Sequence, residues 1–305
     1  MRYTVVLTAA FPSIATSLLA PHFDVIAHPT EHDRTEDDMA TILAEADAAI
    51  VLLSDPITRR VLESNPNLRI VSNFAVGYNN IDLAAARELG VTVTNTPGVL
   101  TEATADLTMA LILAVTRRIV EGDSDIRATG RCEWDPLAFL GASLQGKRLG
   151  IIGMGRIGTA VATRARAFGM EILSARRGDA PDELLATSDI VSLHVPLSQE
   201  THHLIDAAAL AKMKPGAYLI NTARGPLVDE EALCDALERG HLRGAGLDVY
   251  EHEPRVHPRL LQLKNAVVLP HIGSATEEAR NAMARIAATN VLLFLGGAEP
   301  LHRVV

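Results

Sequence analysis

Three side chains with complementary chemistry, Arg224, Glu253 and His271, each follow an apolar run that reads as a buried strand: LINTARG, GLDVYEHEP and LPHIGS. In a parallel sheet the carboxyl ends of the strands meet at one edge, so these side chains are expected to converge there. Arg224 would hold a carboxylate or carbonyl oxygen of an anionic substrate. His271 would give or take a proton near neutral pH, and Glu253 would stabilise its imidazolium form.

Each of these residues also has a structural interpretation. A histidine before a helix can be a cap or core residue, an arginine after a strand can belong to a structural ion pair, and Glu253–Pro254 can be only a turn. Their common position at strand ends of one dinucleotide-binding unit favours the catalytic interpretation. His202 and His203 are adjacent but lack the other ligands expected of a metal site, so they read as loop residues and no metal is predicted. No Ser–His–Asp set is apparent.

A glycine-rich turn, GMGRIG, places Gly153, Gly155 and Gly158 in G-x-G-x-x-G spacing between an apolar strand and a helix expected at 157–168. The first glycine permits the tight turn, the second lets the backbone approach a pyrophosphate, and the third lets helix and strand pack closely. The free N–H groups of the helix would face the anion. The alternative is a purely structural glycine turn.

The strand EILSA, which follows that helix, is succeeded by Arg176 and Arg177 where an NAD-binding unit usually carries Asp or Glu. An acid there would repel the additional phosphate of NADP, whereas arginine attracts it, and Arg156 on the helix side adds charge. We therefore predict a preference for NADP(H), with NAD(H) as the other cofactor to test. The alternative is that both arginines lie in solvent without a ligand.

The elements that must position these residues form two alternating series of strands and helices, which predicts parallel sheets covered by helices. The fold class expected is α/β, with two doubly wound Rossmann or flavodoxin-like domains and an inter-domain cleft. The first series has strands in YTVVL, FDVIAH, AAIVLL, RIVSNFAV and VTVTNT, with helices near 35–46, 57–64 and 81–89. The second has strands in RLGIIGM, EILSA, DIVSLHV, AYLINT, AGLDVY and AVVLPHI.

The domain boundaries follow from the helices that connect the two series. Residues 1–98 with 288–305 are expected to form a substrate-binding domain, and 99–287 a nucleotide-binding domain that includes a dimerisation helix and arm at 99–146. The helix predicted at 101–121 is apolar nearly all round in its middle, which indicates burial between domains or against another subunit. Residues 131–146 read as a loop, and a final helix near 276–295 would return the chain to the first domain.

Composition limits the classes of function. The 305 residues carry a net charge of −9, which argues against nucleic acid as a partner. No run reaches the roughly 18 apolar residues of a membrane span, and the short apolar run at the N-terminus reads as a strand rather than a signal peptide. Two cysteines, Cys132 and Cys234, form no disulfide framework, so we expect a reducing, cytoplasmic location.

These motifs resemble the D-isomer-specific 2-hydroxyacid dehydrogenase family, and within it the glyoxylate/hydroxypyruvate reductases. The similarity covers nearly the whole chain, through LLSDPI, VGYNNIDLAAARELGVTVTNTPGVLTEATADL, GMGRIG, NTARGPLVDEEAL, AGLDVYEHEP and PHIGSAT. The resemblance implies that Arg224, Glu253 and His271 are the catalytic residues. It also implies that the substrate carboxylate is held by Arg224 and by the backbone amides of Val76 and Gly77.

The resemblance further implies a cofactor site in which Thr104 lies on the nicotinamide side, Pro196 near the adenosine and Asp248 against the carboxamide. The full set of implied cofactor-binding residues is Thr104, Gly153, Gly155, Arg156, Ile157, Gly158, Arg176, Arg177, Pro196, Thr222, Asp248, His271 and Gly273. It implies a homodimer, joined through the helix and arm after the first domain, and no membrane or nucleic-acid partner.

Two features depart from the family pattern. Only thirteen residues separate Ala175 from Asp189, where relatives fit another helix and short strand, so a more open adenosine side is expected. The arm after Ile126 is short, and Trp134 in it would match an aromatic residue that some relatives lend to a neighbouring subunit's active site. Val76 stands where the phosphite-oxidising branch of the family has a lysine, which argues against membership of that branch.

The expected function is therefore NADPH-dependent reduction of a small 2-oxo acid, glyoxylate or hydroxypyruvate, to the D-2-hydroxy acid. One alternative keeps the three catalytic residues but changes the substrate to phosphoglycerate, D-lactate or a bulkier 2-oxo acid. Another is a nucleotide-sensing, corepressor-like binding protein, since such relatives retain the same three residues. Poor turnover despite tight nucleotide binding would distinguish that protein from an enzyme.

Overall fold

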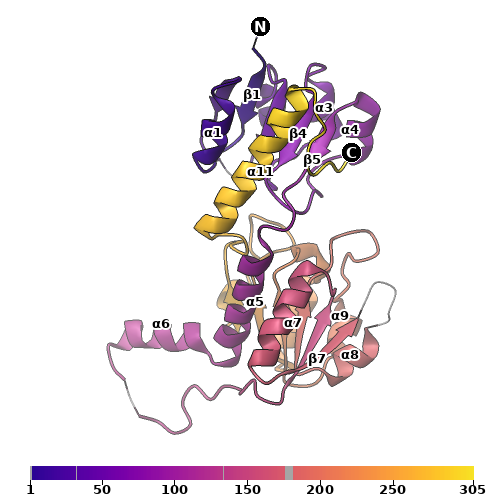
Figure 1. Ribbon diagram of the computed structural model, residues 1–305. Coiled ribbons are helices and arrows are strands. Elements are labelled where there is room, and N and C mark those ends of the chain that lie inside the picture. Colours follow the sequence, from indigo (N-terminus) through magenta and orange to yellow (C-terminus); the bar gives the residue numbers. More distant parts are fainter. Residues whose placement is uncertain (1, 32, 133, 176–180) are drawn as a thin grey trace. The chain divides into compact units, whose positions relative to one another are not determined.

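The computed structural model describes residues 2–31, 33–132, 134–175 and 181–305, and it divides into two compact units (Figure 1). The first unit comprises Met1–Leu100 and Ala275–Val305, and the second comprises Thr101–Ser274. Arg176 and Arg177, on which the prediction of NADP(H) rests, lie outside the described residues.

The first unit is a five-stranded parallel sheet with helices on both faces, in the order β2-β1-β3-β4-β5. Alternate strand side chains pack on one face with apolar residues of α2, α3 and α4. Helices α1 and α11 pack against each other, and α11 lies on β3 and β4. The elements are β1 Thr4–Leu7, α1 Ile14–Leu19, β2 Asp24–Ala27, α2 Glu36–Ile42, β3 Ala48–Val51, α3 Arg59–Glu63, β4 Ile70–Asn73, α4 Leu83–Leu89, β5 Thr92–Thr94 and α11 Glu277–Leu295.

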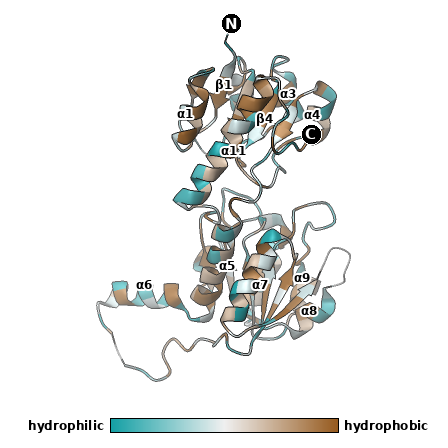
Figure 2. Cartoon of the chain, in the orientation of Figure 1, coloured by the Kyte–Doolittle hydropathy of each residue, from teal (hydrophilic) through white to brown (hydrophobic). Residues whose placement is uncertain are grey.

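The second unit is a six-stranded parallel sheet in the order β11-β10-β9-β8-β6-β7. Helices α5 and α7 cover one face, and α8, α9 and α10 cover the other. The strands of this sheet are largely apolar and lie between these two layers of helices (Figure 2). The elements are α5 Thr101–Thr116, α6 Ile119–Thr129, β6 Arg148–Ile152, α7 Arg156–Ala167, β7 Glu171–Ala175, α8 Asp182–Thr187, β8 Ile190–Leu193, α9 Ala207–Lys212, β9 Ala217–Asn221, α10 Glu230–Glu238, β10 Leu242–Leu247 and β11 Ala266–Val268, with short 3₁₀ turns at Gly225–Leu227 and Leu260–Gln262.

Strand order in the second unit reverses between β6 and β8, because β7 pairs with β6 on one side and the later strands follow on the other. Such a switch point opens a crevice at the carboxyl ends of the strands, where ligands of α/β sheets bind. Strand β7 is one of the two edge strands of this sheet, the other being β11. The chain returns to β8 through α8.

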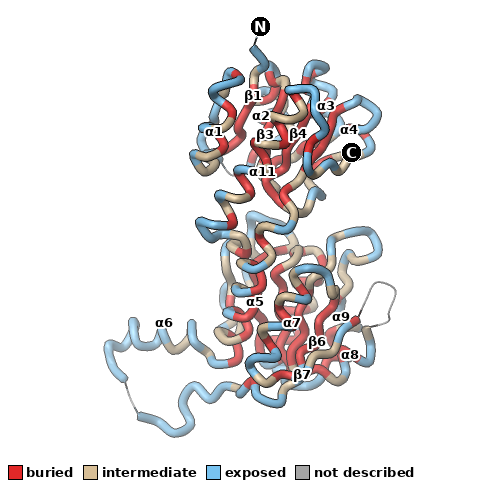
Figure 3. Tube along the Cα trace, in the orientation of Figure 1, coloured by how far each residue is buried: buried red, intermediate tan, exposed pale blue. Residues whose placement is uncertain are grey.

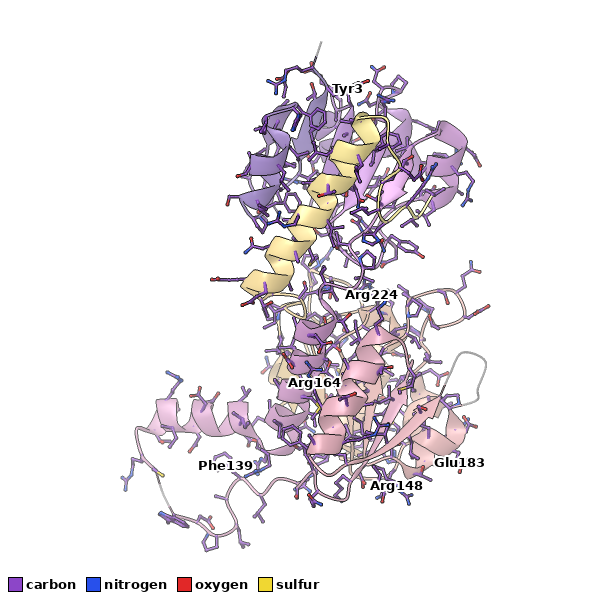
Figure 4. All side chains as sticks on the ribbon, viewed as in Figure 1. Tyr3, Phe139, Arg148, Arg164, Glu183 and Arg224 are labelled. Carbon is purple, nitrogen blue, oxygen red and sulfur yellow. The ribbon has the colours of Figure 1, made fainter. Side chains whose placement is uncertain are left out.

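Helix α5 is held to α7 by charge as well as by apolar packing. Arg164 of α7 contacts Glu102 and Asp106 of α5, with nitrogen–oxygen distances of 2.7 and 2.6 Å (Figure 4). The buried residues of α5 include Thr104, Thr108 and Leu111. The helix packs on β9 and β10 of its own unit, whereas burial between domains or against another subunit was expected.

The expected single helix at 101–121 is wrong in its last part. Helix α5 ends at Thr116, Arg118 adopts a left-handed backbone with φ 53°, and α6 begins at Ile119. An ion pair between Arg118 and Glu121 holds this break. None of the residues of α6 is buried, and the helix and the segment after it project from the second unit (Figure 3).

The boundary near the C-terminus also differs from the expected one. The sequence divides the chain at 288, but α11 is one continuous helix whose buried residues run from Ala279 to Leu295, and the whole helix belongs to the first unit. Its capping residue Thr276 accepts a hydrogen bond from the amide of Ala279. Among the described helices, none has the length and apolar character needed to cross a membrane.

Candidate active site

The three predicted catalytic residues lie beyond the carboxyl ends of three neighbouring strands of the second sheet. Arg224 follows β9, Glu253 follows β10 and His271 follows β11, and Figure 4 labels Arg224 at this edge. Because all strands of this sheet are parallel, the turns that carry these residues leave the sheet on the same side.

The imidazole of His271 is paired with Glu253. Its Nδ1 lies 3.0 Å from Oε2 of Glu253, while Oε1 of that carboxylate accepts a 3.0 Å hydrogen bond from the amide of Tyr250. The two side chains are 38% and 35% exposed, so the pair adds little to stability and acts chiefly to orient the ring. With Nδ1 facing the carboxylate, Nε2 is the ring nitrogen left to exchange a proton.

The backbone of His271 has the left-handed conformation, with φ 53°. A side chain other than glycine adopts this conformation at a cost, and such positions cluster at functional sites. Asp248, which is 1% exposed, holds the chain there by accepting 2.7 Å hydrogen bonds from the amides of Ile272 and Gly273. Burial raises the pKa of Asp248, whereas the Ile272 amide and the His271 imidazole act in the opposite direction.

Arg224 is half-buried and stands on a turn held by its neighbours. Asn221 at the end of β9 accepts a hydrogen bond from the amide of Ala223 and donates one of 2.8 Å to the carbonyl of Arg224. Burial lowers the pKa of Arg224, and the charge of Glu253 acts against that shift, but a guanidinium remains protonated at physiological pH. Arg224 therefore places a cation at the edge that also carries the His271–Glu253 pair.

Gly225 allows the Arg224 turn to approach the chain that leads to Glu253. A Cβ atom at this position would lie 1.8 Å from the carbonyl group of Tyr250, so any side chain would force the two turns apart. Backbone packing therefore requires glycine at position 225. The sequence string ARG contains this residue, but only the tertiary contact shows why it must be glycine.

The glycine turn after β6 contains two glycines that packing requires, Gly153 and Gly158, and one that it does not require, Gly155. Gly153 has φ 101°, and a Cβ there would lie 2.7 Å from the carbonyl of His194; a Cβ on Gly158 would lie 2.2 Å from the carbonyl oxygen of Gly153. A Cβ on Gly155 would meet no protein atom within 4 Å. The space next to Gly155 fits the approach of a pyrophosphate to the first turn of α7, whose N-cap supplies no side-chain hydrogen bond.

The other residues implied for the cofactor lie around the same sheet edge. Thr104 donates a 3.1 Å hydrogen bond to the carbonyl of Gly273, and Thr222 shares one of 2.9 Å with Thr108. Arg156 and Pro196 are exposed, and Ile157 is half-buried. Burial lowers the pKa of His194 at the end of β8 to about 4, so this histidine is neutral at physiological pH.

The backbone amides of Val76 and Gly77 belong to the first unit, after β4. The carbonyl of Ala75 accepts from the amide of Thr96 at 2.9 Å, and the carbonyl of Val76 accepts from Nδ2 of Asn95 at 2.8 Å. These two hydrogen bonds hold the peptide groups that carry the two amides. In the described part of the chain neither amide donates a hydrogen bond to another protein group.

Comparison with known proteins identifies similar enzymes over most of the chain. Residues 109–273 match the family model described as the D-isomer specific 2-hydroxyacid dehydrogenase, NAD binding domain. The chain is 50% identical over 277 residues to a glyoxylate reductase of Thermococcus litoralis, covering 85% of this chain and 84% of that protein. It is 44% identical over 317 residues to the glyoxylate reductase of Thermococcus onnurineus, covering 98% and 95%.

Solved structures show the same architecture. The TT0316 protein from Thermus thermophilus superposes with a TM-score of 0.93 at 45% identity, covering 99% of this chain and 100% of that one. The NADPH-dependent glyoxylate/hydroxypyruvate reductase of Sinorhizobium meliloti, solved with NADP and malonate, has a TM-score of 0.85 at 31% identity, covering 100% and 97%.

The glycine turn can be tested with a matched pair of substitutions. Gly155→Ala should fold with unchanged thermal stability but bind NADPH at least about tenfold more weakly, because the new methyl group enters the space next to the turn rather than the protein core. Gly158→Ala should lower the melting temperature, since its Cβ collides with the Gly153 carbonyl. Calorimetric titration and thermal unfolding measure the two effects. Undiminished nucleotide binding by Gly155→Ala would contradict the assignment.

Proposed function

The chain belongs to the D-isomer-specific 2-hydroxyacid dehydrogenase family of oxidoreductases, and we propose that it uses NADPH to reduce glyoxylate or hydroxypyruvate to the D-2-hydroxy acid. The observation that carries the proposal is the His271–Glu253 pair, held at the same sheet edge as Arg224 and the glycine turn. An acid–base histidine beside an arginine is the donor set that reduction of an anionic ketone or aldehyde requires.

Each residue has a defined task in the proposed reaction. The amides of Val76 and Gly77, together with Arg224, hold the carboxylate of the substrate. The nicotinamide, when bound, supplies the hydride that the carbonyl carbon accepts. His271 enters the reaction protonated and transfers the proton from Nε2 to the oxygen of that carbonyl group. Glu253 holds the ring by Nδ1, which leaves Nε2 for the transfer.

Arg224 acts on the same oxygen electrostatically. Negative charge develops there as the carbonyl carbon is reduced, and a fixed cation of this kind stabilises a transition state by about 3–4 kcal/mol. The half-buried position of the guanidinium strengthens the interaction, because less water screens it.

A short substrate is favoured by the relatives. Two of them are glyoxylate reductases, and the Sinorhizobium meliloti structure holds the small dicarboxylate malonate. Steady-state reduction of a panel of 2-oxo acids that includes bulkier members will decide the point. Higher kcat/KM for the bulky acids than for glyoxylate and hydroxypyruvate would refute the substrate assignment.

The preference for NADPH is supported by charge on both sides of the expected ribose site. Arg156 is the exposed first residue of α7, and Arg176 and Arg177 follow the last residue of β7 in the sequence. The Sinorhizobium meliloti relative, described as NADPH-dependent, was solved with NADP.

We also propose that the protein is a homodimer, with a second copy covering the projecting α6 and the segment after it. This part of the chain exposes large apolar side chains, of which Trp134 is 97% and Leu137 75% exposed. So many exposed large apolar side chains in one segment are unusual on a monomeric surface and are typical of an interface. The others are Ile119, Val120, Ile126, Phe139 and Leu140.

His271→Asn should lower kcat with glyoxylate by about 10²-fold or more, because the amide cannot deliver a proton. Asparagine tolerates the left-handed backbone at this position, so NADPH binding and the melting temperature should stay close to those of the wild type. The matched control is His241→Asn. His241 lies directly before β10, at the amino ends of the strands of the same sheet. A kcat that His271→Asn leaves unchanged would refute the proton-transfer role.

Arg176→Asp combined with Arg177→Ala should move the preference from NADPH toward NADH, since an acid in this region repels the additional phosphate and accepts hydrogen bonds from ribose. The measurement is kcat/KM for both nucleotides with one 2-oxo acid, in the wild type and the double variant. Equal efficiency of NADPH and NADH in the wild type would show that the arginines do not select the cofactor.

Sedimentation equilibrium should give a mass of two chains, each of 32.7 kDa. Leu137→Asp combined with Leu140→Asp should shift the mass toward that of one chain, because each acid would have to be desolvated in the interface. Leu261→Asp, at an exposed position outside the arm, serves as the control. A single-chain mass for the wild type at micromolar concentration would rule out the dimer.

A further inference from the structure

A second group of side chains with ligand chemistry lies in the second unit, apart from the His271–Glu253 pair. His202 and His203, in the loop after β8, meet Glu251, in the turn after β10, and their potential ligand atoms all lie within 4.8 Å of one another. Adjacent histidines read as loop residues in the sequence because no third donor stands near them. The tertiary structure supplies that donor from 48 residues further along the chain.

Both imidazoles are turned to the same side by the backbone. His203 has φ 50°, a left-handed conformation, and its ring stacks on that of His202 with centroids 4.2 Å apart and planes at 27°. Adjacent residues in an extended chain would instead point to opposite sides. The amides of His202 and His203 are anchored to the carbonyls of Ser198 and Pro226 at 2.9 and 2.8 Å, which fixes this arrangement.

The carboxylate is oriented before any ligand binds. Oε1 of Glu251 lies 2.6 Å from Nε2 of His203, while Oε2 accepts a 3.3 Å hydrogen bond from the amide of Glu230 at the start of α10. The amide of Glu251 in turn donates to Oε1 of Glu230 at 2.9 Å. The Glu251 side chain is only 16% exposed, so its rotamers are restricted. Such supporting contacts are typical of carboxylates that bind metals.

We propose that His202, His203 and Glu251 bind one divalent transition-metal ion of the zinc class. Two imidazole nitrogens and one carboxylate oxygen suit zinc and its neighbours, whereas magnesium and calcium prefer oxygen ligands alone. Ligand atoms around a tetrahedral zinc ion lie about 3.4 Å apart, so side-chain adjustments of about 1 Å would convert the observed cluster into a site. Because His202 is exposed, water can occupy the fourth coordination position of the ion.

The position of these three ligand residues determines which parts of the chain a bound ion would join. An ion there would join the loop after β8 to the turn after β10, and that turn also carries Asp248 and Glu253. Glu251 faces His203 rather than His271, so the ion would stabilise the second unit without taking part in proton transfer. The inference does not depend on the proposed substrate or cofactor.

The test uses the full-length protein without a histidine tag, stripped of metal and titrated with zinc chloride by calorimetry. The wild type should bind one ion per chain and gain several degrees in melting temperature when zinc is in excess. Cobalt should give visible absorption of a low-coordinate site. His202→Asn combined with His203→Asn should weaken binding by about tenfold or more and abolish the thermal shift.

The controls separate this site from other histidines and from misfolding. Asparagine suits the left-handed backbone of residue 203, and circular dichroism checks that the double variant is folded. If it is not, Glu251→Gln takes its place, with the same expected loss of zinc. His22→Asn, exposed in the first unit, should bind zinc as the wild type does. Equal zinc binding by the wild type and a folded cluster variant, or none by the wild type at millimolar zinc, would overturn the proposal and leave only a His203–Glu251 hydrogen bond.

Discussion

The active edge of the second unit depends on one constraint: a buried carboxylate, Asp248, holds the main chain of His271 in a left-handed conformation. Both of its carboxylate oxygens accept hydrogen bonds from main-chain amides just beyond the histidine, those of Ile272 and Gly273. This arrangement fixes where the imidazole leaves the backbone, and Glu253 then fixes the direction of the ring. Asp248 offsets the cost of its own burial with these two charge-assisted hydrogen bonds.

Close backbone approach brings the remaining parts to that edge. Gly225 lets the Arg224 turn lie against Tyr250, and Gly158 lets α7 start against Gly153. Both contacts are between main-chain atoms, so a residue with a side chain at either glycine would break them. Gly155 differs, because no protein atom occupies the space that its side chain would fill. The distinction between glycines needed for packing and a glycine needed for a ligand is visible only in the folded chain.

The strands could be predicted well because each is a short apolar run rich in β-branched residues between polar turns. Every strand expected from the sequence overlaps one of β1 to β11. The helices α1, α8, α9 and α10 were not predicted. The first three have six residues each, which give too few turns for an apolar period to appear, and α10 has only nine. The break at Arg118 was missed because a single left-handed residue leaves no mark in an apolar pattern that continues through Ile119 and Val120.

The amino-acid sequence by itself determined the α/β class, the glycine turn and the identity of Arg224, Glu253 and His271 as a candidate set, because these follow from local patterns of about a dozen residues. Tertiary structure alone decided which loops meet. The pairing of Glu251 with His203, and the hydrogen bond from Asn95 to the carbonyl of Val76, depend on strand order and on side-chain contacts. Local sequence cannot specify such contacts, because their partners are brought together by packing of the whole sheet rather than by spacing along the chain.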